Sequence, residues 1–389
     1  MDFDLSYILN HLGENREDYL NSVAPPIFQT AMFASPTVAA MRHMIQNEQN
    51  QPFYTRGNNP TVNTLREKMA ALEGTEDALV FASGSAAIAA AVMANVQAGE
   101  HIVSVQKPYS WTKKLFSTLL PRFGVQITYI DGTDAHNFEK AIQPNTKVLF
   151  LESPNSWTFE QQDIEAVGKI AKAHGLVSII DNSYATPLFQ QPAKYGIDIM
   201  THSATKYIAG HSDAVAGVLC ASREMVSKIF AGEFMTLGGV ISPFNAWLLL
   251  RGLRTLEVRL ERVSQTTAKI IAYLAQHPKI EKIWYPFQPE NPQFELAQKQ
   301  MKQGAGMFSI AVKANDIAEV EGFCNALKRF LLAVSWGAYE SLAFPACVLH
   351  GSPNYPTPDL AWNMIRICIG LEAPDVLIAD FEQALGTLS

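Results

Sequence analysis

The sequence predicts an α/β protein with a mostly parallel sheet covered by helices on both faces, followed by a smaller α+β domain. Between about Asn58 and Val240, short apolar runs alternate with amphipathic segments. Several of these runs are apolar throughout, as expected for strands buried on both faces. The 389 residues also exceed the length of about 250–300 residues at which a single core stops growing. Two packed domains are therefore expected.

Three regions follow one another along the chain. Residues 1–57 contain several prolines and glutamines and little periodicity, which indicates an extended N-terminal arm. Residues 58–240 form the large domain. Its apolar runs predict strands at residues 78–82, 101–105, 125–130, 147–151, 176–180 and 196–202. Helical periodicity between them predicts helices at residues 63–74, 85–96, 110–123, 135–142 and 163–175.

Residues 241–389 form a connecting helix and the smaller C-terminal domain. Apolar residues at helical spacing from about 245 to 276 predict one long or broken helix. Beyond it, strands are expected at residues 306–312 and 364–370, and helices at residues 319–330 and 375–386.

The composition excludes several classes of function. The net charge is −7 and the sequence has no run of Lys or Arg, so nucleic acid is not an expected partner. The first residues are acidic where a secretory signal is basic, and the longest weakly polar segment, residues 81–99, is too polar for a membrane span. A cytoplasmic protein without a membrane partner is expected. The cysteines lie in or near apolar runs without metal-ligand spacing, so buried reduced thiols and no metal are expected at Cys220, Cys324, Cys347 and Cys368.

Candidate site residues follow the ends of strands, where open α/β sheets bind ligands. The turn of Ser83, Gly84 and Ser85 opens a helix with small residues, whose free N–H groups could hold a phosphate, although small residues open many ordinary helices too. Asp181 ends a fully apolar strand, so it either caps the following turn or faces a ligand. Tyr109 follows another strand and either stacks on a planar ring or covers the core.

Two cations complete the set of candidates. Lys206 stands beside Ser203 and Thr205, and a desolvated lysine forms Schiff bases with carbonyl carbons, although a lone lysine is more often on the surface. Arg366 interrupts an apolar strand, either to bind a carboxylate or because it faces outward on an edge strand. A phosphate cradle, a stacking aromatic ring, a carboxylate for a ring nitrogen and a reactive lysine are together the groups that pyridoxal 5′-phosphate requires.

These residues resemble the Cys/Met-metabolism family of pyridoxal-phosphate-dependent enzymes, which have the aspartate-aminotransferase-like fold, fold type I. The matching segments are APPIFQT, YTRGNNPT, ALVFASGSAA, ESPNS, IIDNSYATP, HSATKYIAGHSDAVAG, RGLRTLEVRL, SWGAYESL and RICIGLE. They span nearly the whole chain, and the SATKY and GHSD blocks are the most specific of them. The resemblance implies a large sheet of seven-stranded type.

The resemblance also implies a role for each candidate. Lys206 carries the cofactor and moves protons, Asp181 pairs with the pyridine nitrogen, and Tyr109 stacks on the ring. The phosphate is bound by Gly84, Ser85, Ser203 and Thr205, and from the neighbouring subunit by Tyr54 and Arg56. The substrate carboxylate is bound by Ser335 and Arg366, with Asn155 near it and near the ring O3′. A homodimer would then be essential, and a tetramer is expected.

The sequence departs from the family pattern at several positions that bear on the reaction. Ser85 stands where the family usually has methionine, and Trp111 stands where methionine γ-lyases carry a reactive cysteine. Trp336 after Ser335 resembles bacterial cystathionine β-lyases, whereas the segments APPIFQT and PACVLHGS resemble the γ-enzymes.

The expected function is that of a pyridoxal-phosphate-dependent carbon–sulfur lyase of trans-sulfuration. β-Elimination of cystathionine to homocysteine, pyruvate and ammonia is the preferred reaction. The alternative is γ-chemistry, as in cystathionine γ-synthase, cystathionine γ-lyase or methionine γ-lyase. A catalytically idle protein that binds the cofactor is the third interpretation, and the intact Lys206 and Asp181 argue against it.

Overall fold

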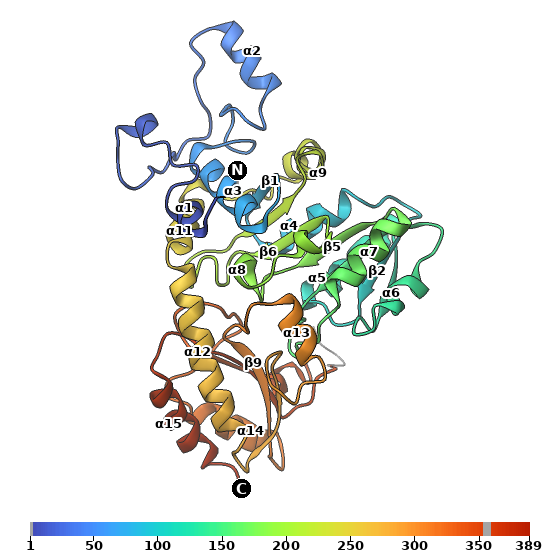
Figure 1. The fold of residues 1–389 in the computed structure, drawn as a ribbon, viewed down its shortest axis with the longest axis vertical. Coiled ribbons are helices and arrows are strands. Elements are labelled where there is room, and N and C mark those ends of the chain that lie inside the picture. The colour runs from blue at the N-terminus through green and yellow to red at the C-terminus, as the bar shows by residue number, and fades with distance from the viewer. Residues whose placement is uncertain (1–2, 353–358) are drawn as a thin grey trace. The chain divides into compact units, whose positions relative to one another are not determined.

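The computed structural model describes residues 3–352 and 359–389 (Figure 1). The chain packs into two compact units. Unit 1 contains the chain up to Ser153 together with Gln162–Ala209 and Asp213–Arg254. Unit 2 contains Pro154–Gln161, Gly210–Ser212 and the chain from Thr255 onward. Two short loops that interrupt unit 1 in the sequence thus belong to unit 2.

Unit 1 is built on a seven-stranded sheet with the order β1-β7-β6-β5-β4-β2-β3. The strands are β1 (Asp77–Phe81), β2 (His101–Val105), β3 (Gln126–Ile130), β4 (Thr146–Glu152), β5 (Val177–Asp181), β6 (Ile199–Ser203) and β7 (Gly217–Ala221). Strands β3, β2, β4, β5 and β6 pair in parallel, and β7 is antiparallel to both β6 and β1. The mostly parallel sheet is therefore confirmed, and β7 is a strand that the apolar pattern did not predict.

The helices of unit 1 precede, connect or follow these strands. They are α3 (Pro60–Glu73), α4 (Gly84–Met93), α5 (Ser110–Lys114), α6 (His136–Ala141), α7 (Ile164–His174), α8 (Thr186–Phe189), α9 (Arg223–Ile229), α10 (Met235–Leu237) and α11 (Pro243–Leu253). Asn59 caps α3, Ser83 caps α4 and Asp163 caps α7, because each side-chain oxygen accepts a bond from an otherwise unpaired N–H of the first turn. Alanine dominates α4, and its inner side is fully buried against the sheet.

The N-terminal segment is only partly an extended arm. Helix α1 (Leu5–Asn10) is fixed to α3 because Lys68 Nζ donates to the carbonyls of Ile8 and Leu9 and pairs with Glu14 at 3.1 Å. Helix α2 (Val38–Gln46) has no buried residue and stands away from the sheet of unit 1 in Figure 1. That this arm reaches a neighbouring subunit stays a prediction.

Unit 2 contains a five-stranded sheet with the order β10-β11-β12-β9-β8. Its strands are β8 (Ile280–Trp284), β9 (Met307–Val312), β10 (Leu331–Leu332), β11 (Leu342–Pro345) and β12 (Met364–Cys368). Its helices are α12 (Leu256–Leu274), α13 (Phe294–Gln300), α14 (Ile317–Ala326) and α15 (Pro374–Leu385). The expected connecting helix is broken, since α11 ends at Leu253 and α12 begins at Leu256.

The four cysteines are free and buried, as expected. Burial raises the pKa of Cys324 to about 12, so its thiol stays protonated at neutral pH. No helix in the described part of the chain is both long and apolar enough to span a membrane.

Candidate active site

The candidate site of unit 1 lies where the parallel strands β4, β5 and β6 end. Glu152, Asp181 and Thr201 are paired in register across these strands, so their carboxyl ends meet at one edge of the sheet. Tyr109, in the loop after β2, is joined to this edge because its backbone N–H donates to Glu152 Oε2 at 2.6 Å. The Tyr109 side chain is 41% exposed, which leaves its ring accessible at the site instead of packed in the core.

Asp181 is a buried carboxylate that its own turn holds in place. The backbone N–H and the hydroxyl of Ser183 both donate to Asp181 Oδ1, at 3.0 and 2.5 Å. Burial raises the pKa of Asp181 above its ordinary value of 3.8. The two bonds from Ser183 and the nearby charges of His202 and Lys206 oppose that increase. A ring nitrogen that carries a proton would stabilise this buried anion further.

Lys206 follows β6 in a tight turn in which its backbone N–H donates to the Ser203 carbonyl at 3.1 Å. Its ammonium is close enough to Asp181 to favour the charged carboxylate. The structure therefore brings together the two residues that the sequence singled out as amine and anion.

The turn before α4 provides the cradle for an anionic group. A Cβ atom on Gly84 would lie 2.9 Å from both Cα and Cβ of Ser203, so only glycine permits this approach of helix to strand. Ser85 is exposed in the first turn of α4, whose N–H groups lack partners within the helix. These residues fit a phosphate at the positive end of a ten-residue helix.

The hydroxyl of Thr205 is hydrogen-bonded to the backbone of Ala216. Its hydroxyl donates to the Ala216 carbonyl at 3.2 Å and accepts from the Ala216 N–H at 3.1 Å. Because its one proton is already used, a phosphate contact by this hydroxyl would require that bond to break. The role of Thr205 in phosphate binding stays a prediction.

Tyr54 and Arg56 lie on the arm. Both are exposed, and the Arg56 guanidinium stacks 5.4 Å from the centroid of the Tyr54 ring. A single backbone bridge joins Tyr54 to Met32. Contact with a neighbouring subunit would require both side chains to be exposed in the single chain. That contact stays a prediction.

Unit 2 contains the expected carboxylate-binding residues. Arg366 lies on β12, between β11 and β9, so the alternative of an outward-facing residue on an edge strand is wrong. Its guanidinium lies 5.0 Å from the centroid of Trp157 and 5.4 Å from that of Phe344, and it donates to the Val334 carbonyl at 2.7 Å. Ser335 directly follows Val334 in the chain, so it is the neighbour of the residue whose carbonyl Arg366 binds.

Asn155 has a local structural role. Its side-chain oxygen accepts from the Thr158 hydroxyl and the Glu160 N–H, both at 3.2 Å, and its amide donates to the Glu160 carboxylate. These bonds fold the loop that carries Trp157, whose φ of +67° lies in the left-handed region. A direct contact of Asn155 with cofactor or substrate stays a prediction.

Three residues of the site were not predicted from the sequence. Glu152 ends an apolar strand as Asp181 does, so the same signal could have identified it. Ser183, two positions after Asp181, matches the spacing of a side chain that folds back onto its own turn. His202 has no such local signal, because it meets Glu73 from a distant segment.

A lysine close to a buried carboxylate, with a helix N-terminus that could hold a phosphate, is the arrangement that pyridoxal phosphate requires. The family model described as Cys/Met metabolism PLP-dependent enzyme matches residues 7–386. The chain therefore belongs to the Cys/Met-metabolism family of pyridoxal-phosphate-dependent enzymes, and pyridoxal phosphate is its cofactor.

Relatives and solved structures agree with this family. The chain is 37% identical over 383 residues to L-methionine gamma-lyase of Pseudomonas putida, which covers 96% of this chain and 95% of the relative. It is 36% identical to cystathionine gamma-lyase of Bacillus subtilis, over 97% of this chain and 98% of the relative. The crystal structure of cystathionine gamma-lyase from Lactobacillus plantarum complexed with L-serine matches with a TM-score of 0.91 and 32% identity, over 99% of each chain. The chain is thus a pyridoxal-phosphate-dependent carbon–sulfur lyase, and these relatives are named γ-lyases, not β-lyases.

Proposed function

We propose that the protein cleaves the Cγ–S bond of a sulfur amino acid and releases a thiol, ammonia and 2-oxobutanoate. The observation that carries this proposal is the similarity to γ-lyases at 36–37% identity over nearly the full length of both chains. It replaces the β-elimination that the sequence favoured on the basis of Trp336. Cystathionine is the preferred substrate, because Trp111 stands where a methionine γ-lyase would carry its cysteine.

Pyridoxal phosphate, when bound, supplies the aldehyde that captures an amino group and the ring that takes up negative charge from Cα. Lys206 Nζ would hold the cofactor and would accept the Cα proton of the substrate. For γ-elimination the same amine must also remove a proton from Cβ. The proposal therefore requires that the Lys206 side chain, in the turn after Ser203, can move between Cα and Cβ. Asp181 would keep the ring nitrogen of the bound cofactor protonated.

The remaining residues hold the reactants in place. Tyr109 would stack on the ring of the bound cofactor, and Gly84, Ser85 and Ser203 would hold its phosphate. In a homodimer, within a tetramer of two such dimers, Tyr54 and Arg56 of the neighbouring subunit complete the phosphate site. Arg366 and Ser335 bind the substrate carboxylate, and the stacking of Arg366 against Trp157 fixes the plane of the guanidinium fork. Asn155 acts through the loop that presents Trp157.

β-Elimination of cystathionine to homocysteine, pyruvate and ammonia is the second candidate. It is favoured by two bulky side chains: Trp111, which is 57% exposed two positions after Tyr109, and Trp336, which directly follows Ser335. Indole bulk at these positions would shorten the space available to a substrate chain beyond Cβ.

The keto acid distinguishes the two reactions. Purified holoenzyme is incubated with L-cystathionine and, separately, with L-methionine, and the products are identified by mass spectrometry. The proposal expects 2-oxobutanoate from cystathionine, with slower release from methionine. Pyruvate as the main product would overturn it in favour of β-elimination. Absence of any keto acid from a panel of sulfur amino acids would indicate a cofactor binder without lyase activity.

A further inference from the structure

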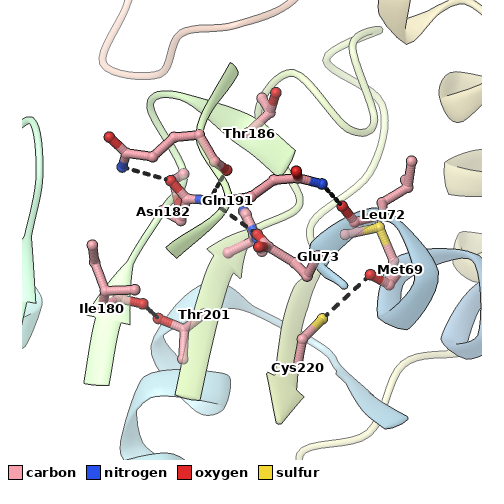
Figure 2. A network of polar contacts seen from close by, with 12 residues as sticks. Met69, Leu72, Glu73, Ile180, Asn182, Thr186, Gln191, Thr201 and Cys220 are labelled. Carbon is pink, nitrogen blue, oxygen red and sulfur yellow. Dashed lines mark hydrogen bonds and ion pairs between the residues drawn. The ribbon is translucent and has the colours of Figure 1, made fainter. Parts of the chain in front are cut away.

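A buried polar cluster lies within unit 1, and of its members only His202 was named among the site residues above. Its members are Glu73, Asn182, Gln190 and His202, and each of them is 1% exposed or less. Figure 2 shows Glu73 at the end of α3 directed toward Asn182, next to the strands that carry Ile180 and Thr201. A carboxylate buried this completely is costly unless donors surround it, so the contacts of Glu73 require an explanation.

One oxygen of Glu73 joins two strands. Asn182 Nδ2 donates to Glu73 Oε1 at 2.9 Å, and His202 Nε2 donates to the same oxygen. Asn182 directly follows β5, and His202 lies on β6. Glu73 Oε2 and His202 Nδ1 have no hydrogen-bond partner among the described residues, so the shared oxygen is the one through which this carboxylate acts on the sheet.

Further hydrogen bonds hold Asn182 in place. Its amide also donates to the Gln190 carbonyl at 3.0 Å, and Gln190 Nε2 donates to Asn182 Oδ1 at 2.9 Å and to the Ser153 carbonyl at 2.8 Å. The Asn182 backbone N–H donates to the Thr201 carbonyl at 2.9 Å. The cluster thus connects the ends of α3, β4, β5 and β6.

The two residues that Glu73 joins are the sequence neighbours of two cofactor residues. Asn182 follows Asp181, the partner of the ring nitrogen, and His202 precedes Ser203, a residue of the phosphate cradle. Successive side chains of a strand point to opposite faces of the sheet, so His202 and Ser203 face opposite sides. Ser203 accordingly packs against Gly84 of α4, whereas His202 meets Glu73 of α3.

We propose that Glu73 is a positioning residue for the cofactor. From the face of the sheet opposite the site, its shared carboxylate oxygen ties Asn182 to His202 and thereby fixes the spacing between Asp181 and Ser203. The ring nitrogen and the phosphate of one rigid molecule must reach these two residues at once, so a change in their spacing weakens both contacts together. This inference rests on the proposed assignment of Asp181 and Ser203 to the cofactor.

The test measures cofactor binding to the apoprotein, not turnover. Wild type, Glu73→Gln and Glu73→Ala are stripped of cofactor and titrated with pyridoxal phosphate, and the dissociation constant is followed by absorbance. Glutamine still offers one oxygen to both Asn182 and His202, so Glu73→Gln is expected to bind within about threefold of wild type. Glu73→Ala loses both bonds and is expected to bind about tenfold or more weakly.

Arg66→Leu is the matched control, because Arg66 is a buried charged residue on the same helix. Its bonds go to Gln49, Asp77 and Ala78, none of which belongs to the site. It is expected to lower the melting temperature of the apoprotein while its cofactor affinity stays within about twofold of wild type. If Glu73→Ala does not fold, His202→Gln, which keeps a donor, and His202→Ala are compared with the same expected order.

The inference is overturned if Glu73→Ala binds cofactor as well as Arg66→Leu does, or if Glu73→Gln binds as weakly as Glu73→Ala. Asp181→Asn, measured alongside, separates this failure from failure of the site assignment. If Asp181→Asn weakens cofactor binding and Glu73→Ala does not, only the positioning role of Glu73 is wrong. If Asp181→Asn leaves binding unchanged, the assignment of Asp181 itself is wrong and the inference falls with it.

Discussion

The hydroxyl of Ser183 links Asp181 to Ser203: it donates to Asp181 Oδ1 at 2.5 Å and accepts the backbone N–H of Ser203 at 2.6 Å. One small side chain therefore links the anion proposed for the ring nitrogen to the strand end proposed for the phosphate. It also supplies one of the two bonds that keep the pKa of Asp181 from rising further.

The raised pKa of Asp181 predicts how the stability of the apoprotein depends on pH. For an acid whose pKa is higher in the folded state, the stabilising contribution is fully present below the ordinary value of 3.8 and is lost as the pH rises through the higher folded pKa. Above that pKa the cost of burying the charge is only partly offset by Ser183, His202 and Lys206. Asp181→Asn should therefore increase the unfolding free energy of the apoprotein at neutral pH by about 1 kcal/mol, with a gain that shrinks toward acid.

Urea unfolding of apoprotein at a series of pH values measures this effect. Ser183→Ala removes a bond that favours the carboxylate, so it should destabilise the apoprotein at neutral pH. Ser178→Ala is its control, because the hydroxyl of Ser178, on β5 with Asp181, donates to Asp198 at 2.7 Å away from the site. This variant should leave cofactor affinity unchanged. An Asp181→Asn apoprotein less stable than wild type at neutral pH would contradict the account of this carboxylate.

Gly84→Ala should weaken cofactor binding. The added Cβ would lie 2.9 Å from the backbone of Ser203, so α4 or β6 must shift, at a cost of about 1–3 kcal/mol in stability. The displaced helix N-terminus would then hold the phosphate poorly, with a dissociation constant about tenfold higher or more. Gly232→Ala is the control, because its Cβ would meet nothing within 4 Å. Equal cofactor affinity of the two variants would contradict the cradle.

Sequence patterns predict site residues at strand ends, but not contacts between residues that are far apart in the chain. The sequence singles out Asp181, Tyr109 and Lys206 because each ends or follows an apolar run, and parallel strands place such ends along one edge. The sequence does not single out Glu73 and His202. They are far apart in the chain and meet only after the sheet has formed, and neither stands at a strand end on the site face. Strand β7 was missed because its short run GVLCA follows the glycine- and alanine-rich loop with no helix between β6 and β7.

Two residues of unit 2 show the same dependence on tertiary pairing. Asn155 matches a family block in sequence, but its bonds depend on Thr158 and Glu160, which close the loop from within. That Arg366 lies on a central strand could not be known before the order of the five strands was known. Local pattern therefore predicted which residues are polar at strand ends, and tertiary pairing decided what they contact.

Arg366→Leu should raise the KM for an amino-acid substrate by about 10- to 100-fold, because a bidentate charge-assisted contact with the carboxylate is lost. Trp157→Leu should raise it less, since the guanidinium loses its stacking partner but keeps its bond to the Val334 carbonyl. Steady-state kinetics with cystathionine measure both, and Trp284→Leu, on β8 and stacked on Lys282, is the control. An unchanged KM in Arg366→Leu would exclude this arginine from carboxylate binding.

Arg56→Ala and Lys206→Ala subunits should complement one another when mixed. Each variant alone lacks one half of every active site if Arg56 acts across the subunit interface, whereas a mixed dimer contains one site with both residues. Random reassociation should then restore about a quarter of wild-type activity. Mixed dimers, verified by differently tagged subunits, that stay inactive would show that Arg56 acts within its own chain or not at all.

Reduction of the holoenzyme with borohydride, followed by proteolysis and peptide mass mapping, tests the central claim most directly. The account predicts one peptide with the mass of a reduced pyridoxyl phosphate group, attached at Lys206, and no such peptide in Lys206→Ala. A modification on another lysine, or a holoenzyme that gives no modified peptide, would contradict the assignment of Lys206 as the residue that carries the cofactor.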